Sequence, residues 1–365
     1  MKEPLRIAYV NSTHKWAGVK TWTLDTASWL FKQGHDVTIF GRPGPFTDKA
    51  REHGLETFAL DFGVDFSPAL ILRFVRFFRS RRTDVLVANV GKDLRTAGVA
   101  ARLAGVPVLH RVGAPNDMRD TAKVRLMHRL AVSRILVPSH DTKDGLLAGL
   151  PHLEPEEVAV IHTGKPVSPE PPRPVRRPLR LIVTSRLSPD KGHADLLRSL
   201  AELARRGLDF RLDVLGSGDL ERELKLLADS LGLAERVRWL GFRTDVSERL
   251  RGCDAFVLPS YVEGLPNTLL EAMAQGLCPV ARDVGGVREI WPSGSEGLDG
   301  LLAGMEPEAL LPPLERLLSA DDAQVMAWKR AAWEQCRTAF DIEKQGIKFE
   351  ELLRGLAAGK RHTFD

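Results

Sequence analysis

Two glutamates separated by seven residues, Glu263 and Glu271, are well placed in this sequence to do chemistry. Pro266 is typical of a first helical turn and Gly276 of a helix end, so we expect a helix near residues 267–275. The main-chain amides at its start, reinforced by the helix dipole, suit an anionic group such as a phosphate. The amides concerned are those of Asn267, Thr268 and Leu269.

The two carboxylates suit hydroxyl groups better than a phosphate, because like charges repel. Glu271, just over one turn inside the helix, could accept hydrogen bonds from the vicinal hydroxyls of a ribose. Glu263, on the preceding loop, could reach a sugar on the other side of the phosphates. The alternative is that Glu271 merely complements the helix dipole and Glu263 is solvated surface.

A cationic pair, Arg186 and Lys191, lies on the loop between an expected strand at 181–183 and an expected helix near 194–206. Two cations beside a helix start are what a diphosphate needs, although a solvated loop is the simpler interpretation. The glycines of residues 216–218 are interpreted as a structural turn. The sequence contains neither the Gly-x-Gly-x-x-Gly fingerprint nor a Walker loop, so nicotinamide and ATP-hydrolysis functions lose their main support.

Short β-rich runs alternate with longer helical patterns in both halves of the chain, which is typical of parallel sheets covered by helices. We therefore predict an α/β protein with two Rossmann-like, doubly wound domains facing a central cleft, where ligands would bind beyond the carboxyl ends of the strands. The last strand is expected at residues 278–281. The strands expected before it lie at 7–10, 37–40, 85–88, 106–110, 134–138, 158–161, 181–183, 211–215, 237–240 and 255–258.

The domain boundary is predicted from proline content. Residues 165–178 contain six prolines, which helices and central strands exclude. We expect an N-terminal domain at 1–165, a linker at 166–178 and a second domain at 179–339. The remaining segment, 340–365, is expected to be a C-terminal helix and tail that cross back to the N-terminal domain.

Composition narrows the class of protein further. The 365 residues are 43% hydrophobic and 27% charged, as in ordinary globular proteins, and 52 basic against 48 acidic residues leave a net charge of +4. That balance argues against a nucleic-acid partner. Cys253, Cys278 and Cys336 have no metal-binding or disulfide spacing, and we find no signal peptide or membrane-spanning run, so a cytoplasmic location is expected.

The second half resembles the retaining glycosyltransferases of the GT-B fold, family 4 or group 1, over about 120 residues. The resemblance is carried by Glu263 and Glu271 together with the segments Ser185–Gly192, Leu240–Phe242 and Val284–Ile290. It implies that Arg186 and Lys191 grip the diphosphate of a nucleotide-sugar, that Glu271 holds its ribose and that Glu263 contacts the donor sugar. We count Arg186, Lys191 and Glu263 as catalytic. The remaining expected donor-binding positions are Gly18, Gly241, Phe242, Arg243, Gly264, Asn267, Thr268 and Leu269.

The first half is similar to the family at fewer positions. Residues 16–20 resemble its glycine-pair loop, with Ala17 in place of the first glycine and Gly18 keeping the second. Asn89 and Gly113 stand where many members have histidines. The expected acceptor-binding residues are Ala17, Asn89, Arg111, Gly113, Asn116 and Asp117, and the last two are equally suited to be helix caps.

The resemblance implies transfer of a hexose, with retained configuration, from a UDP- or GDP-linked sugar to a hydroxyl of a saccharide or lipid-linked acceptor. Bacterial cell-envelope polysaccharide or lipopolysaccharide synthesis is the expected setting. We infer front-face substitution, in which the acceptor proton passes to the departing phosphate oxygen. No cofactor is expected. Without an Asp-x-Asp signature, and with two cations beside the diphosphate, we also expect metal independence.

One predicted helix suggests contact with the cytoplasmic face of an anionic inner membrane. It is rich in phenylalanine and carries arginines but no acid. The alternative is that its apolar stripe packs on the sheet while the arginines lie in water. The arginines are Arg73, Arg76, Arg79, Arg81 and Arg82.

Two other functions remain open at this point. A nucleotide-sugar epimerase can share this architecture, but it would need acid and base carboxylates in the cleft and no acceptor. A non-catalytic carbohydrate- or membrane-binding protein could also keep the fold. The presence of Arg186, Lys191, Glu263 and Glu271 together argues against it.

Overall fold

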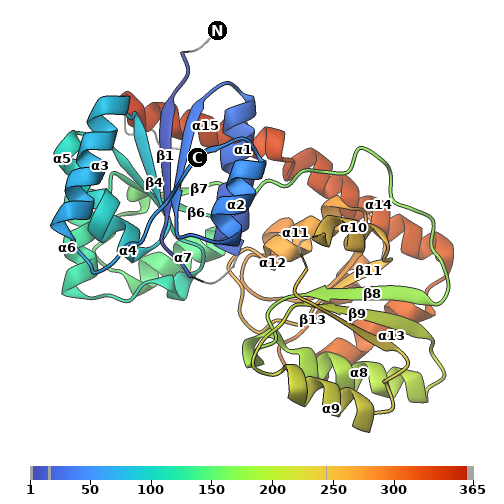
Figure 1. The fold of residues 1–365 in the computed structure, drawn as a ribbon. Coiled ribbons are helices and arrows are strands. Elements are labelled where there is room, and N and C mark those ends of the chain that lie inside the picture. Colours follow the sequence, from blue (N-terminus) through green and yellow to red (C-terminus); the bar gives the residue numbers. More distant parts are fainter. Residues whose placement is uncertain (1–2, 15–17, 244, 360–365) are drawn as a thin grey trace. The chain divides into compact units, whose positions relative to one another are not determined.

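The computed structural model describes residues 3–14, 18–243 and 245–359 (Figure 1). Ala17, an expected acceptor residue, lies outside the described residues. The chain forms two compact units. Unit 1 combines Met1–Gly164 with Ile342–Asp365, and unit 2 is the continuous segment Lys165–Asp341. The chain therefore passes from one unit to the other twice, at 164/165 and at 341/342.

Unit 1 is built on a seven-stranded parallel sheet with the order β3-β2-β1-β4-β5-β6-β7. Its strands are β1 (Arg6–Asn11), β2 (Asp36–Gly41), β3 (Glu56–Ala59), β4 (Val85–Ala88), β5 (Val108–Arg111), β6 (Arg134–Val137) and β7 (Val158–Val160). Its helices are α1 (Gly18–Lys32), α2 (Pro45–Glu52), α3 (Pro68–Arg81), α4 (Gly91–Asp93), α5 (Val99–Ala104), α6 (Ala122–Ala131), α7 (His140–Gly149) and α15 (Ile342–Ala357).

Alternating side chains of β1 explain why both faces of this sheet are covered. Ile7 and Tyr9 belong to one buried cluster, and Ala8 and Val10 belong to another. The first cluster includes residues of α1, α2 and α15, and the second includes residues of α3 and α5. A central strand with a continuous apolar run, here Ile7–Val10, needs helices on both sides, as the sequence predicted.

Unit 2 repeats this plan with a six-stranded parallel sheet of order β10-β9-β8-β11-β12-β13. Its strands are β8 (Leu179–Thr184), β9 (Phe210–Leu215), β10 (Val237–Gly241), β11 (Ala255–Leu258), β12 (Cys278–Arg282) and β13 (Leu302–Ala303). Its helices are α8 (His193–Arg205), α9 (Glu221–Ser230), α10 (Val246–Arg251), α11 (Asn267–Ala274), α12 (Val287–Ile290), α13 (Leu311–Ser319) and α14 (Asp322–Ala339). One buried cluster fills this unit.

The two doubly wound sheets confirm the predicted fold class, but one strand prediction was wrong. A short strand, β13, follows β12 and pairs with it in parallel, at Ala281↔Leu302 and Arg282↔Ala303. Its two residues are too few to display the periodicity by which a strand is recognised in a sequence.

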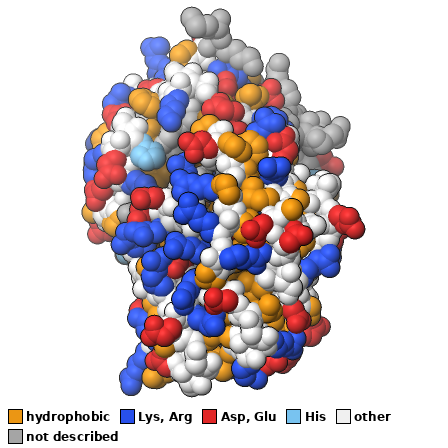
Figure 2. All heavy atoms as spheres, turned by 90° about the vertical axis from the view of Figure 1, so that its right-hand side faces the viewer, with side chains coloured by type: hydrophobic (Ala, Val, Ile, Leu, Met, Phe, Trp, Pro, Cys, Tyr) orange, Lys and Arg blue, Asp and Glu red, His pale blue; other side chains and the backbone are white. Residues whose placement is uncertain are grey.

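Helix α3 packs as the second of our two interpretations expected, with its apolar stripe on the sheet and its arginines in water. Phe74, Val75 and Phe78 are buried against unit 1, while the arginines of the helix are exposed. In the described residues, no helix is both long enough and apolar enough to cross a membrane. The molecular face drawn in Figure 2 intersperses basic, acidic and apolar side chains, in keeping with the nearly balanced charge.

Candidate functional site

The predicted catalytic side chains lie on loops that leave the carboxyl edge of the unit 2 sheet. Strands β8 and β11 are neighbours, although β9 and β10 come between them in the sequence. The connections that leave these two strands lead to opposite sides of the sheet, and such a switch point opens a crevice for ligands. Arg186 and Lys191 follow β8, and Glu263 follows β11.

The structure brings Lys191 and Glu263 together across this switch point. Lys191 Nζ lies 2.7 Å from Glu263 Oε1 and donates to the carbonyl oxygen of Val262 at 3.2 Å. Both side chains are 18% exposed, so the ion pair is largely, though not fully, shielded from solvent. Arg186 is 59% exposed and only loosely associated with Asp190, at 3.9 Å. Its guanidinium is therefore available to a ligand.

Two glycines allow the loops around this ion pair to approach each other closely. Gly192 has φ 64°, and a Cβ atom there would lie 2.0 Å from the carbonyl oxygen of Pro259. Gly285 has φ 54°, and its Cβ would lie 2.3 Å from the carbonyl oxygen of Glu263. Any larger residue at either position would displace the Glu263 loop, because that backbone conformation and that spacing admit only glycine.

The start of α11 partly meets the prediction of free amides. Pro266 precedes the helix, and the amides of Asn267 and Thr268 have no hydrogen-bond partner in the described part of the chain. We expected the amide of Leu269 to be free as well, but this was wrong. It donates to the carbonyl oxygen of Pro266 at 3.1 Å. Two amides, rather than three, are left for a ligand at this helix start.

Glu271 forms an ion pair that the sequence did not reveal. Lys165 Nζ lies 2.8 Å from Glu271 Oε1, and the lysine is only 1% exposed. The Lys165 amide donates to the carbonyl oxygen of Phe340 at 2.9 Å. Lys165 immediately precedes the proline-rich linker, 106 residues before Glu271, and no local pattern in the sequence indicates its partner.

Arg282 is a second residue that the sequence did not reveal, and it fixes the start of the loop that carries Glu263. Arg282 is fully buried at the end of β12, where its Nε donates to the carbonyl oxygen of Pro259 at 3.0 Å. Its Nη2 lies 2.9 Å from Asp195 Oδ2, and Tyr261 also donates to that carboxylate. This network ties β12, α8 and the loop after β11 together.

Several buried polar atoms at this edge lack a hydrogen-bond partner within the described ranges. Buried polar groups are nearly always paired, so such atoms indicate a ligand or ordered water. They are Thr184 Oγ1, His193 Nδ1, Ser260 Oγ and Asn267 Oδ1. The other nitrogen of His193 lies 3.1 Å from Ser185 Oγ, and burial lowers the pKa of His193 to about 4, so this imidazole is neutral near pH 7.

The expected base-binding segment lies at the end of β10. Gly241 accepts a hydrogen bond from the amide of Gly216 at 2.9 Å, and Phe242 is 55% exposed. Arg243 forms two hydrogen bonds of 2.8 Å to Asp245, which raise the pKa of Arg243 and lower the pKa of Asp245. Phe242 is thus free to stack on a ring, whereas Arg243 is engaged.

Two further glycine positions have roles in packing. A Cβ atom on Gly216 or Gly218 would collide with the carbonyl oxygen of Ser185 or Leu187, respectively. This close backbone contact agrees with our interpretation of residues 216–218 as a structural turn. Gly264 is buried and accepts a hydrogen bond from the amide of Gly286 at 2.7 Å.

The expected site residues of unit 1, namely the donor-binding Gly18 and the acceptor-binding positions that the structure describes, lie along the corresponding edge of its sheet. Gly18 begins α1, and Asn89 follows β4, where its Nδ2 donates to the carbonyl oxygen of Val10 at 2.9 Å. Arg111 ends β5 and is buried. Asp117 Oδ2 accepts hydrogen bonds from the amides of Gly113 and Ala114, so Asp117 caps the short turn, and Asn116 is exposed.

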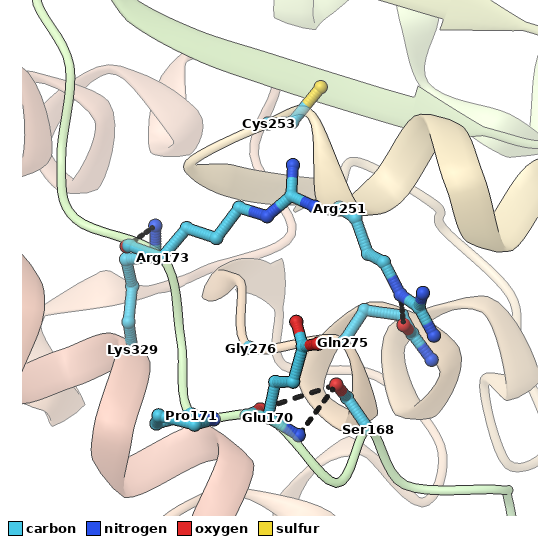
Figure 3. Close-up of a pocket in the computed structure, with 9 residues that line it drawn as sticks. All are labelled: Ser168, Glu170, Pro171, Arg173, Arg251, Cys253, Gln275, Gly276 and Lys329. Atoms are coloured by element: carbon cyan, nitrogen blue, oxygen red, sulfur yellow. Dashed lines mark hydrogen bonds between the residues drawn. The ribbon is translucent and has the colours of Figure 1, made fainter.

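A small hollow in unit 2 lies away from these loops (Figure 3). It is lined by Cys253, which precedes β11, and by Gln275 and Gly276, which precede β12, so it opens at the amino edge of the sheet. Parallel sheets bind ligands at the opposite edge. We therefore do not assign this hollow to the candidate site. In the described residues, no group of three or more His, Cys, Asp or Glu side chains is placed to hold a metal ion.

Comparison with known families agrees with this arrangement. Residues 168–334 match the model of glycosyl transferases group 1, and residues 16–168 match the model of glycosyltransferase family 4. The chain belongs to the group 1 glycosyltransferases of the GT-B fold, and is thus a glycosyltransferase.

Among its relatives, an Escherichia coli enzyme named UDP-Gal:alpha-D-GlcNAc-diphosphoundecaprenol alpha-1,3-galactosyltransferase is 22% identical over 385 residues, with 98% of each chain covered. A Campylobacter jejuni N-acetylgalactosaminyltransferase, whose name gives a diphospho-undecaprenol acceptor, is 32% identical over 174 residues, with 46% of each chain covered. The crystal structure of Anabaena Alr3699/HepE in complex with UDP-glucose has a TM-score of 0.80 at 20% identity, with 96% of this chain and all of that chain covered.

Proposed function

We propose that this glycosyltransferase moves a hexose, with retention of configuration, from a UDP- or GDP-sugar to a hydroxyl of a saccharide or lipid-linked acceptor. The observation that carries the proposal is the pairing of Lys191 with Glu263, beside the free amides of α11 and the loosely held Arg186. Two relatives are named for transfer to a diphosphoundecaprenol-linked sugar, and a structural neighbour was crystallised with UDP-glucose.

The proposed roles follow from the surroundings of each side chain. Arg186, Lys191 and the amides of Asn267 and Thr268 would hold the diphosphate. Glu263, held by Lys191, would accept hydrogen bonds from donor-sugar hydroxyls, and Glu271 would accept them from the ribose. Gly241 and the exposed ring of Phe242 would lie against the base.

In the proposed reaction, the bond between the anomeric carbon and the phosphate oxygen breaks while the acceptor oxygen bonds to the same face of that carbon. The acceptor proton passes to the departing phosphate oxygen, which balances the charge. The protein contributes by positioning the reactants and by stabilising the negative charge that grows on the diphosphate. Because Arg186 and Lys191 supply positive charge there, we propose that transfer needs neither a divalent metal nor another cofactor.

We also propose that unit 1 contacts anionic lipid at the cytoplasmic face of the membrane through α3. The arginines of this helix are exposed beside exposed Leu72, which suits a surface of negative headgroups. Binding to vesicles with and without phosphatidylglycerol tests this, with Arg73→Gln and Arg76→Gln as variants. Equal binding to both kinds of vesicle would contradict it.

The test of the main proposal is incubation with UDP- and GDP-sugars, with and without a lipid-linked saccharide, followed by assay of free nucleoside diphosphate and of the product anomer. Transfer requires acceptor-dependent release. Isomerisation without an acceptor would indicate an epimerase, the absence of any turnover would indicate a binding protein, and an inverted anomer would exclude retention.

Lys191→Ala should reduce kcat on the order of 10²-fold, because it removes one preorganised charge from the leaving group. The variant should still fold, although its unfolding temperature should fall modestly, because Glu263 loses its partner in an ion pair that is only 18% exposed. The exposed Arg222→Ala on α9 is the control. Wild-type kinetics in Lys191→Ala would remove this residue from the site.

A further inference from the structure

The carboxyl edge of the unit 1 sheet contains two cations that are buried without a carboxylate partner. Arg111 is 6% exposed and Lys20 is 5% exposed. Within the described ranges neither side chain forms an ion pair, and the only hydrogen bond is from Lys20 Nζ to the carbonyl oxygen of His14, at 3.3 Å. Buried arginines and lysines are rare unless they are paired, so each position is costly for a protein without ligand.

The surroundings of Arg111 satisfy only part of its guanidinium. Arg111 Cζ lies 5.1 Å from the centroid of the Trp22 ring, so the cation is in cation–π contact with the indole. Five N–H donors at the edge of the group are left over, because none makes a hydrogen bond to a described residue. Burial lowers the pKa of Arg111 to about 10, so it remains charged at neutral pH.

The nearest carboxylate, Asp117, is occupied elsewhere. Its Oδ2 accepts from the amides of Gly113 and Ala114, at 3.0 and 2.9 Å. Gly113 leaves space for the guanidinium, because a Cβ atom there would lie 2.8 Å from Arg111 Nη1. The loop after β5 thus accommodates the cation without neutralising it.

Polar groups at the ends of neighbouring strands complete the edge. Asn11 ends β1, Asn89 follows β4 and Arg111 ends β5, and these three strands are adjacent at the switch point of the sheet. Asn11 Nδ2 and Ser12 Oγ are buried without a hydrogen-bond partner among the described residues. Unused donors on the same sheet edge as an unpaired buried cation indicate an anionic ligand.

We infer that Arg111 binds an anionic group of the acceptor, a phosphate or a carboxylate, at the carboxyl edge of the unit 1 sheet. The planar guanidinium matches either group with two parallel hydrogen bonds. That the anion belongs to the acceptor rests on the proposed transfer reaction. That Arg111 is a buried cation without an ion-pair partner in the described residues does not depend on that reaction.

The test is calorimetric binding to the full chain of two anionic probes, a short prenyl diphosphate and a methyl glucuronoside, each beside its uncharged counterpart. The variants are Arg111→Met, which keeps the apolar stem, Arg111→Lys, which keeps the charge, and the exposed Arg51→Met on α2 as control. We expect one anionic probe to bind, and its Kd to rise at least about tenfold in Arg111→Met, less in Arg111→Lys and not in Arg51→Met. The probe that responds identifies the phosphate or the carboxylate.

Two companion measurements separate this role from others. UDP affinity should be the same in Arg111→Met and wild type; a parallel loss would mean that the anion is the diphosphate of the donor and would overturn the inference. The unfolding temperature of Arg111→Met should not fall, because no partner is left unpaired. A clear fall would make Arg111 a structural residue.

Other results would also overturn the inference, namely wild-type protein that binds neither anionic probe, or Arg111→Met that binds them as the wild type does. Failure of the transfer assay alone has a different meaning. Probe binding that depends on Arg111, without any sugar transfer, would keep the anion site and reject the proposed function.

Discussion

Lys165 and Glu271 form an ion pair in which one partner is buried and the other reaches solvent. The carboxylate proposed to bind the ribose lies close to the proposed phosphate site, where its negative charge is unfavourable. Lys165 offsets that charge and fixes the carboxylate at the same time. We therefore regard Lys165 as a positioning residue.

Lys165→Met should raise the donor KM about tenfold while it leaves kcat within a factor of about two, because it changes binding and not the leaving group. A double-mutant cycle with Glu271→Gln should give a coupling energy of about 1 kcal/mol or more in denaturant unfolding. The same cycle on the surface pair Lys225 and Glu221 is the control and should give less. Additive effects of Lys165→Met and Glu271→Gln would contradict the role.

At the scale of elements, α15 packs closely on α1, with Gly346 against the Trp29 ring. A Cβ atom on Gly346 would lie 2.5 Å from the Trp29 ring, whose indole nitrogen donates to Glu343 at 2.8 Å. Phe349 packs edge-on against Trp22. The close approach of the two helices is therefore possible only because Gly346 has no side chain.

Gly346→Ala should lower the unfolding temperature of the protein, because the added methyl group forces the helices apart and the gain in helix propensity of about 1 kcal/mol does not offset this. Gly149→Ala is a matched control, since a Cβ atom there meets nothing. Thermal unfolding of both variants measures the effect. If Gly346→Ala were as stable as Gly149→Ala, the tight contact would be refuted.

The sequence predicted the parallel strands other than β3 and β13 because each is a short apolar run between turn residues, and it predicted Arg186, Lys191 and Glu263 because each lies within a few residues of a recognisable strand or helix end. It did not predict Lys165 or Arg282. Their partners, Glu271 and Asp195, lie 106 and 87 residues away in the chain. Such pairs depend on which strands become neighbours, and no local pattern encodes that.

At the scale of the whole molecule, two buried histidines in unit 1, His110 and His128, make its stability depend on pH. His128 Nδ1 lies 3.1 Å from His152 Nε2, and the rings of His110 and His128 are 5.8 Å apart. Burial lowers the pKa of His110 to about 3 and that of His128 to about 4, with the neighbouring imidazole adding to each shift. Glu157 opposes the shift of His128.

Between pH 6.5 and about 4 the unfolded chain therefore binds more protons than the folded unit, and the free energy of unfolding falls as the pH is lowered. We expect the protection factors of amides in β5 and α6, which compare the measured exchange rate with the intrinsic rate at the same pH, to fall from pH 7 to pH 5. His128→Gln should reduce this dependence. An unchanged pH profile in the variant would show that these histidines do not control the effect.

Unit 1 is made of two separate segments of the chain, and this affects when each unit can complete its folding during synthesis. Unit 2 is one uninterrupted stretch and can fold as it leaves the ribosome, but Trp22 and Trp29 are not covered until α15 has been translated. At roughly 10 residues per second, more than about 30 seconds separate the synthesis of α1 from that of its last neighbour. During that interval the nascent N-terminal part exposes aromatic surface, so this portion, rather than the later one, is where a chaperone would be needed.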